Sequence, residues 1–295
     1  MPKKLTAEQV ASYQHNGFLA PIAGLSAQEV AGYRERLAAY EAAIGGPVTS
    51  TAVDPRYRFR THTLLSWVND LVRHPAILDA TEDLIGPDIL VYMTTWFIKE
   101  PCSEALTVWH QDATYFGLRP HLHVTAWVAL SDATAAHGCM EFLPASPRLG
   151  QLEHRAFAHK NSINGGGQQA VIAIDEAAVT PAPLRAGEFS FHHTLCLHRS
   201  QPNRTSERRI GLAISYIPTH VRHIGTPGKA PAMLVRGTDT YGHFELEAPP
   251  TGDYDAASRA THADYYARYR ASYNEQVALL SGARPATTAA ASSQS

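Results

Sequence analysis

An imidazole and a carboxylate stand two residues apart in the segment Trp109-His110-Gln111-Asp112. The residues that lead into it, 106–110, predict an extended strand, on which positions i and i+2 point to the same face. His110 and Asp112 would then converge on one point. They would supply two of the three ligands of a 2-His-1-carboxylate site, which keeps open positions on a bound metal ion. Taken alone, this spacing more often belongs to a polar surface.

Two other segments have a similar spacing, and both are discounted. His262 and Asp264 fall in a predicted helix, where positions i and i+2 do not face each other. His243 and Glu245 have only His262 downstream as a third ligand, and that residue lies in the same predicted helix. The pair at 110 and 112 is therefore the stronger candidate.

A second polar cluster, residues 198–209, could complete the site. His198 lies at the end of an apolar strand segment that begins at Gly187, and Arg209 starts another strand after a turn. Such a turn could bring both side chains into one cavity. A buried guanidinium is a rigid fork that suits a carboxylate. An iron enzyme with a dicarboxylate co-substrate needs this combination.

Neighbouring residues compete for both roles in this cluster. His192 and His193 are alternative candidates for the distal histidine ligand. Arg208 could be confused with Arg209, but alternation along a strand places the two side chains on opposite faces.

The elements that must position these residues begin with helices. Helices are predicted at 5–16, capped by Thr6 with Gln9, and at 26–44, capped by Ser26 with Glu29. Apolar residues at helical spacing continue over 63–85, where Pro75 starts a new segment. A further helix with several tyrosines is predicted at 254–280, and we expect these tyrosines to pack against the body. The Ala/Thr/Ser-rich tail 285–295 is predicted to be disordered.

Between the helical ends, the sequence is typical of short strands rich in β-branched and aromatic residues. No regular strand–helix alternation is present, which favours a β-sandwich or double-sheet barrel wrapped by helices. The predicted strands are 89–98, 106–110, 122–130, 139–143, 170–174, 187–191 and 210–216, and the chain becomes irregular after Pro218.

Composition excludes several classes of protein. The 295 residues contain 25 Lys and Arg against 27 Asp and Glu, a net charge of −2, which argues against nucleic-acid binding and electrostatic membrane attachment. The 3 isolated cysteines argue against a disulfide framework or a thiolate zinc site. With neither a secretory signal nor an apolar run of about 20 residues, the expected location is the cytoplasm.

The motifs together resemble the phytanoyl-CoA dioxygenase family of Fe(II)/2-oxoglutarate-dependent oxygenases. The resemblance covers about residues 5–218, and its most specific parts are 109–130, 138–146 and 187–209. It implies a mainly β fold with peripheral helices, a double-stranded β-helix of the jelly-roll or cupin type. One dioxygenase domain would span 1–284, with a helical part at about 5–85, a β-core at about 88–218 and a helical extension at about 254–280.

The resemblance also implies roles for individual residues. His110, Asp112 and His198 would bind Fe(II), with His198 preferred because Ser200 and Arg209 follow it as in the family. Arg209 would pair with the distal carboxylate of 2-oxoglutarate, and Ser200 would hydrogen-bond the same end. Trp127 would line the co-substrate pocket, and Gln111 would contact the co-substrate.

The reaction implied by the resemblance consumes O2 and 2-oxoglutarate and forms succinate and CO2. Related halogenases have Ala or Gly in place of the carboxylate ligand. Asp112 therefore predicts hydroxylation or desaturation, and a free small metabolite of specialised metabolism is the expected substrate, bound by a monomer or homodimer. The alternatives are a metal-dependent hydrolase and a non-catalytic jelly-roll binding module.

Candidates for contact with the substrate are Lys99, Thr114, Tyr115, Arg119 and Arg222. Lys99 and Arg119 would suit an anionic group, although solvation or salt bridges account for these residues equally well.

Overall fold

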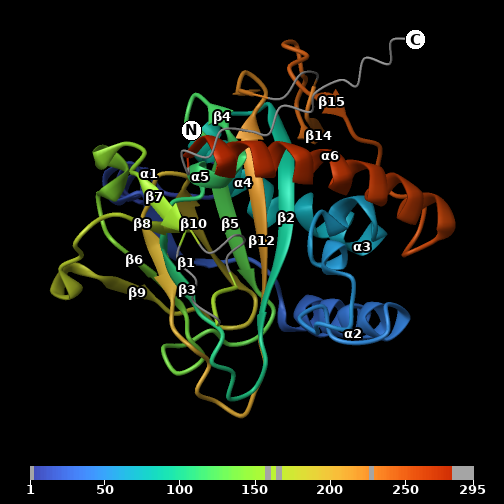
Figure 1. Ribbon diagram of the computed structural model, residues 1–295, viewed down its shortest axis with the longest axis horizontal. Coiled ribbons are helices and arrows are strands. Elements are labelled where there is room, and N and C mark those ends of the chain that lie inside the picture. Colours follow the sequence, from blue (N-terminus) through green and yellow to red (C-terminus); the bar gives the residue numbers. More distant parts are fainter. Residues whose placement is uncertain (1–2, 157–160, 164–167, 226–228, 281–295) are drawn as a thin grey trace, which may run out of the picture.

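Two facing β-sheets form the centre of the computed structural model, which describes residues 3–156, 161–163, 168–225 and 229–280 (Figure 1). The tail at 285–295 lies outside the described residues. The large sheet has the order β1 (Phe18–Ala23), β10 (Glu188–His193), β5 (Val124–Ala129), β12 (Arg209–Pro218), β2 (Ile89–Lys99), β14 (Pro231–Arg236) and β15 (Glu245–Leu246). The small sheet has the order β3 (Thr107–His110), β11 (His198–Ser200), β6 (Met140–Phe142) and β9 (Thr180–Ala182). Apart from the parallel pair β14–β15, neighbouring strands in both sheets run antiparallel.

Two short strand pairs flank these sheets. β4 (Leu118–Arg119) pairs with β13 (Arg222–His223), and β7 (His154–Ala156) pairs with β8 (Gln168–Ala170). The helices are α1 (Ala7–Asn16), α2 (Ala27–Ala43), α3 (Ser66–Val72), α4 (Pro75–Ile85), α5 (Ala113–Phe116) and α6 (Ala256–Leu280), with short 3-10 helices η1 (Pro55–Arg58) and η2 (Thr61–Thr63). None of the helices described here is long and apolar enough to cross a membrane.

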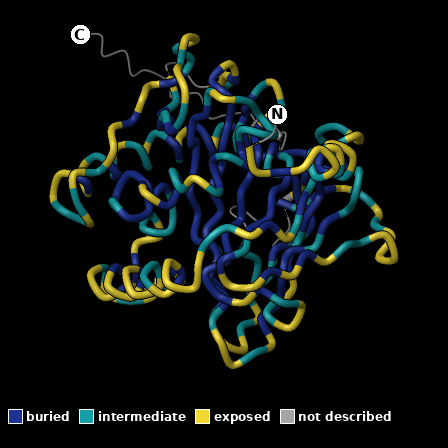
Figure 2. The backbone as a smooth tube through the Cα atoms, turned by 180° about the vertical axis from the view of Figure 1, so that it is seen from behind, coloured by how far each residue is buried: buried dark blue, intermediate teal, exposed yellow. Residues whose placement is uncertain are grey.

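Alternation along the central strands gives the large sheet two different faces. In β12, Leu212 and Ile214 join the main apolar core together with side chains of α2, α3 and α4, which cover this face. Arg209 and Ala213 point to the other face, toward the small sheet. β5 follows the same pattern and carries Trp127 on the inner face. Figure 2 shows the resulting distribution, with buried backbone along the strands and an exposed outer side on α2.

The helix predictions are confirmed, including both N-terminal caps. Thr6 with Gln9 and Ser26 with Glu29 form complete capping boxes at α1 and α2. Pro75 is the first residue of α4. The long predicted C-terminal helix is α6, which packs Tyr269 and Tyr273 against a second apolar cluster at the ends of β2 and β12.

Three strand predictions need correction. β8 ends at Ala170, so the predicted strand at 170–174 is wrong. His198 does not end the strand that begins near Gly187, because β10 stops at His193 and the chain crosses to the small sheet before β11 starts. The region after Pro218, predicted as irregular, contains β14, which pairs with β2 and widens the large sheet.

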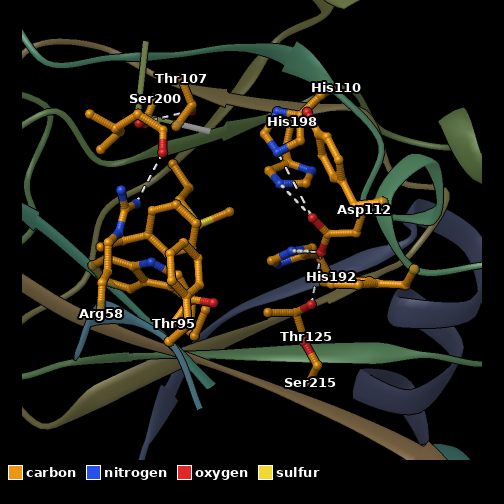
Figure 3. Close-up of a pocket in the computed structure, with 18 of the residues that line it drawn as sticks. Arg58, Thr95, Thr107, His110, Asp112, Thr125, His192, His198, Ser200 and Ser215 are labelled. Carbon is orange, nitrogen blue, oxygen red and sulfur yellow. Dashed lines mark hydrogen bonds and ion pairs between the residues drawn. The ribbon is translucent and has the colours of Figure 1, made fainter. Parts of the chain in front are cut away.

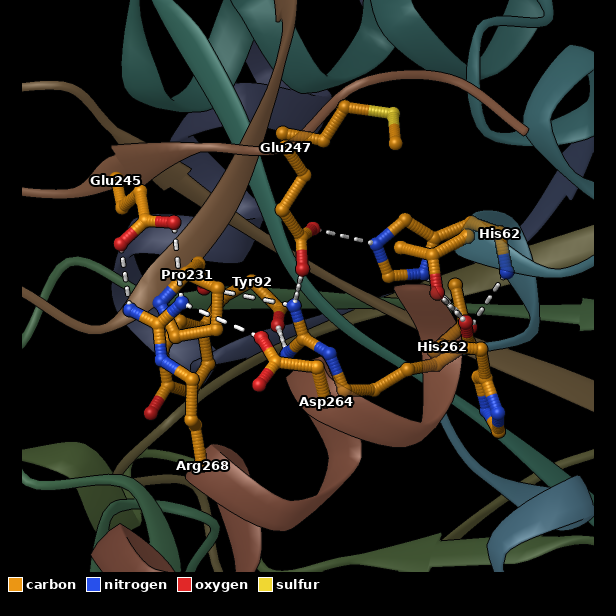
Figure 4. A network of polar contacts seen from close by, with 12 residues as sticks. His62, Tyr92, Pro231, Glu245, Glu247, His262, Asp264 and Arg268 are labelled. Atoms are coloured by element: carbon orange, nitrogen blue, oxygen red, sulfur yellow. Dashed lines mark hydrogen bonds and ion pairs between the residues drawn. The ribbon is translucent and has the colours of Figure 1, made fainter. Parts of the chain in front are cut away.

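A buried ionic cluster joins the segment after β15 to the body of the protein (Figure 4). The carboxylate of Glu247 forms an ion pair with Arg60 and accepts a hydrogen bond from Nε2 of His62 at 3.2 Å. Arg60 also donates from Nη1 to the carbonyl oxygen of Tyr92 at 2.6 Å. All three charged or ionisable side chains are fully buried. The cluster fixes the chain that leads into α6.

Candidate active site

His110, Asp112 and His198 meet at one end of the cavity between the sheets (Figure 3). Their possible ligand atoms all lie within 4.8 Å of one another. His110 and His198 are direct cross-strand partners on β3 and β11. Nε2 of His110 lies 3.9 Å, and Nε2 of His198 lies 3.8 Å, from the same oxygen of Asp112, Oδ1.

Asp112 reaches this point by a different route from the one the sequence predicted. β3 ends at His110, and Asp112 has helical backbone angles, φ −60° and ψ −32°, directly before α5. Strand alternation therefore does not align the two side chains. A strand end followed at once by a helical turn brings the carboxylate back toward the histidines.

Backbone carbonyl groups fix the orientation of both imidazoles. Nδ1 of His110 donates to the carbonyl oxygen of Val108 at 2.7 Å, and Nδ1 of His198 donates to that of Cys196 at 2.9 Å. Because a carbonyl only accepts, the proton of each neutral ring sits on Nδ1 and the Nε2 lone pair faces Asp112. Burial lowers the pKa of both histidines, which favours the neutral form that binds metals.

The second oxygen of Asp112, Oδ2, is held by hydrogen bonds. It accepts one from Nε2 of His192 at 3.1 Å and one from the hydroxyl of Thr125 at 2.9 Å. Burial by itself raises the pKa of Asp112, but the His192 hydrogen bond and the nearby imidazoles hold it well below its usual value. The sequence made His192 an alternative candidate for the distal histidine ligand. In the structure its Nε2 is used in the hydrogen bond to Asp112. Two neutral imidazoles and an ionised carboxylate form a donor set that fits Fe(II).

Arg209 lies in the same cavity on β12, a buried cation without an acidic partner among the described residues. Its Nη1 donates to the carbonyl oxygen of Gly138 at 2.5 Å, and its Cζ lies 5.2 Å from the centre of the Trp127 ring. Its Nε is buried and has no hydrogen-bond partner within the described part of the chain. Burial lowers the pKa of Arg209 to about 9. A carboxylate ligand would satisfy this group. Arg208, in contrast, points outward and pairs with Glu41 and Glu100.

Lys99 is the direct cross-strand partner of Arg209, on β2. Its Nζ donates to Oγ of Ser200 at 2.8 Å and to the carbonyl oxygen of Gln201. Burial, together with the nearby charge of Arg209, lowers the pKa of Lys99 to about 5. Lys99 was predicted to contact substrate, but it lies behind Ser200 and is not part of the cavity lining, whereas Ser200 is.

The Trp127 indole packs directly against Gly211. A Cβ atom added to this glycine would come within 2.0 Å of Cζ2 of the indole. The bare backbone at 211 therefore allows the ring to lie against the sheet beside Arg209.

Of the remaining sequence candidates, only Tyr115 lines the cavity, and the others lie outside its lining. Gln111 donates to the carbonyl oxygens of Gly150 and Leu195 and so connects two loops. These hydrogen bonds give Gln111 a structural role in place of the predicted contact with the co-substrate. The other three are Thr114, hydrogen-bonded to His154; Arg119, which donates to Gln151; and Arg222, exposed on β13.

The cavity has a volume of about 850 Å³, including space open to solvent. Sequence reasoning missed the residues that line it from η1 and α6, namely Arg58, Tyr269, Arg270 and Tyr273. The tyrosines of α6 were expected only to pack against the body. The one signal available was the spacing of Tyr269 and Tyr273, which places them on one helix face.

The phytanoyl-CoA dioxygenase (PhyH) family model matches residues 13–211. The chain belongs to this family. It is 25% identical over 274 residues to the protein named "Probable alpha-ketoglutarate-dependent hypophosphite dioxygenase" from Stutzerimonas stutzeri, covering 84% of this chain and 92% of that one.

Solved structures of similar fold agree with this assignment. The non-heme monooxygenase ThoJ, in its apo form, superposes with a TM-score of 0.79 and 35% identity over 91% of this chain and 98% of its own. CytC3 with Fe(II) and alpha-ketoglutarate shares the fold, with a TM-score of 0.63 and 21% identity over 86% of this chain and 97% of that one. The PhyH member described here is therefore an Fe(II)/2-oxoglutarate-dependent oxygenase with a double-stranded β-helix fold, and its cofactors are Fe(II), 2-oxoglutarate and O2.

Proposed function

We propose that this oxygenase hydroxylates a small molecule of specialised metabolism, with His110, Asp112 and His198 as the iron ligands. One observation carries this proposal. Two Nε2 lone pairs and one carboxylate oxygen face a common point, and no hydrogen bond between these atoms satisfies them. Acceptor atoms arranged in this way are mutually repulsive unless a cation lies between them.

Arg209 is the proposed partner of the distal carboxylate of 2-oxoglutarate. Its forked guanidinium lies in the same cavity as the candidate ligands, and it has no acidic partner among the described side chains. Ser200, held by Lys99, would contribute a hydroxyl at this end, and Trp127 would form the wall.

Bound iron and 2-oxoglutarate supply the oxidising chemistry, in which one atom of O2 enters a substrate C–H bond and the other enters succinate as CO2 leaves. The residues of this chain bind the reactants, orient them and exclude water. Asp112 occupies the position that a halide needs in the related halogenases, which favours oxygen insertion. The size of the cavity suits a small ligand.

The deciding experiment is an anaerobic titration of the protein with Fe(II) and 2-oxoglutarate. We expect a weak visible charge-transfer band in the wild type, its loss in His110→Ala, and its retention in His243→Ala, which removes a histidine distant in sequence from the cluster. Uncoupled succinate formation in air should likewise be present in the wild type and in His243→Ala and be lost in His110→Ala. A wild type that gives neither the band nor succinate would show that the assignment is wrong.

The mass of the product distinguishes hydroxylation from desaturation. A substrate found by screening for stimulated succinate release should gain one atom of ¹⁸O under ¹⁸O2. A product that lacks two hydrogens and carries no label would replace hydroxylation with desaturation.

A further inference from the structure

Helix α6 forms part of the cavity wall, although it lies beyond residue 211, where the family match ends. Tyr269, Arg270 and Tyr273 of this helix all line the cavity. The candidate iron ligands and Arg209, in contrast, come from β3, β11, β12 and the turn before α5. The candidate ligands and the lining residues of α6 thus come from different parts of the chain.

The wall is a continuous series of aromatic rings that begins at the candidate metal site. The ring of Tyr115 lies 6.0 Å from that of His110 and stacks on Tyr273 at 5.6 Å, with an angle of 6° between the planes. Tyr273 lies 5.9 Å from Tyr269, which lies 6.4 Å from Phe59. Such a surface favours a flat or apolar body beside the iron ligands.

Two arginines border this wall and have no acidic partner within the described part of the chain. Arg270 lies with its Cζ 4.7 Å from the centre of the Tyr273 ring. Arg58 donates from Nε to the carbonyl oxygen of Trp96 at 2.7 Å and from Nη2 to that of Ile163 at 3.0 Å. Figure 3 shows Arg58 on the side of the cavity opposite the iron-ligand candidates.

The charge of the cavity is unbalanced. Arg58, Arg209 and Arg270 line it, but Asp112 is the one acidic residue that the structure places in the lining. Since 2-oxoglutarate is assigned to Arg209, the other two guanidinium groups remain for a second anion.

Tyr273 adds an unused polar atom to this wall. Its side chain is only 5% exposed, and its hydroxyl is buried without a hydrogen-bond partner in the described structure. A buried hydroxyl in this state carries a free-energy cost that a bound ligand would remove.

We propose that α6 is the substrate-recognition element and that the substrate is an anion with a flat apolar body. Its carboxylate or phosphoryl group binds at Arg270, with Arg58 as a second cation. Its body lies along Tyr269 and Tyr273, and the Tyr273 hydroxyl donates a hydrogen bond to the anionic group. This inference rests on the proposed function, because it assigns Arg209 to 2-oxoglutarate.

The test compares an anionic probe with its neutral analogue. Isothermal titration calorimetry is run anaerobically on protein with Fe(II) and saturating 2-oxoglutarate, using 3-phenylpropanoate, phenyl phosphate and the neutral 3-phenylpropanamide. We expect one or both anions to bind at least about ten-fold more tightly than the amide. The preference should fall below about three-fold in Arg270→Gln. Arg268→Gln is the matched control, because Arg268 lies on the same helix and pairs with Glu245.

Three results would overturn the inference: equal affinity for anions and amide, a preference that survives in Arg270→Gln, or displacement of the anions by more 2-oxoglutarate. The visible band is recorded on the same samples before the probe is added. Its absence beside charge-selective probe binding would reject the proposed function and leave the recognition role of α6 standing.

Tyr273→Phe provides a second, independent arm. It keeps the ring and removes the unpaired hydroxyl, so anion affinity should fall several-fold while the melting temperature of the ligand-free protein stays the same or rises. A lower melting temperature with unchanged affinity would make the hydroxyl structural and contradict its assigned role.

Discussion

Nε2 of His192 donates a hydrogen bond to Oδ2 of Asp112, 3.1 Å away, and leaves Oδ1 facing His110 and His198. The two oxygens of one carboxylate thus have separate tasks. One is held by the protein, and the other is directed at the point where the imidazoles converge.

Replacing His192 should therefore weaken metal binding although His192 is not one of the proposed ligands. We expect His192→Phe to lower Fe(II) or Co(II) affinity by about 10- to 100-fold, because a ligand carboxylate that loses its orienting partner is less well positioned. His193→Asn is the control, since it keeps an acceptor for the backbone N–H of Leu195 on the other face of β10. Equal affinities in the wild type and His192→Phe would contradict the role assigned to this hydrogen bond.

The affinity for 2-oxoglutarate should depend on Arg209. In Arg209→Gln we expect the dissociation constant, measured from the visible band, to rise at least about 30-fold, equivalent to about 2 kcal/mol. Arg208→Gln should leave this constant unchanged, because Arg208 pairs with Glu41 and Glu100 outside the cavity. If Arg209→Gln binds 2-oxoglutarate normally, the anchor lies elsewhere.

Lys99 should give the protein a recognisable dependence of stability on pH. Burial lowers its pKa from 10.5 to about 5, so between these values the unfolded chain holds a proton that the folded chain does not. The contribution of Lys99 to the free energy of unfolding therefore rises with pH in this window, by at most about 1.4 kcal/mol per unit.

Lys99→Met removes this dependence. The free energy of unfolding of the variant minus that of the wild type should be larger at pH 6 than at pH 9, as measured by urea unfolding at both values. A stability difference that stays constant between the two pH values would mean that Lys99 remains charged in the folded protein.

The buried cluster around Glu247 should contribute far more to stability than the exposed pair two residues earlier in the chain. Glu247→Gln leaves Arg60 and His62 buried without their anion, and we expect a loss of about 3 kcal/mol or more in the free energy of unfolding. Glu245→Gln breaks the half-exposed pair with Arg268 and should cost less than about 1 kcal/mol. Equal losses would show that the buried charges are not coupled as Figure 4 depicts.

Features that depend on a few neighbouring residues could be predicted from the sequence. The capping boxes at Thr6 and Ser26 are local hydrogen-bond patterns, and the alternation that separates Arg208 from Arg209 follows from strand geometry. The family resemblance then singled out His110, Asp112 and His198, which the structure brings together.

Features that depend on the crossing of distant segments could not be predicted. Residues 195–197 are apolar and look like a continuation of β10. No local pattern therefore shows that His198 begins a strand in the other sheet. Strand alternation predicts the face of β2 on which Lys99 lies. Its position behind Ser200, however, depends on where β11 packs. Tyr269 and Tyr273 enter the cavity because α6 packs across α5 and η2. No residue pattern in the sequence predicts this packing.

Gly211 has a consequence for the size of the co-substrate that this pocket accepts. The Trp127 indole rests where any side chain at 211 would have to be, so even one added methyl group would displace the ring toward the space in front of Arg209. The absence of a side chain at 211 thus gives the co-substrate pocket its depth, and we expect Gly211→Ala, which makes the pocket shallower, to discriminate more strongly against 2-oxoadipate, the dicarboxylate one carbon longer, than the wild type does.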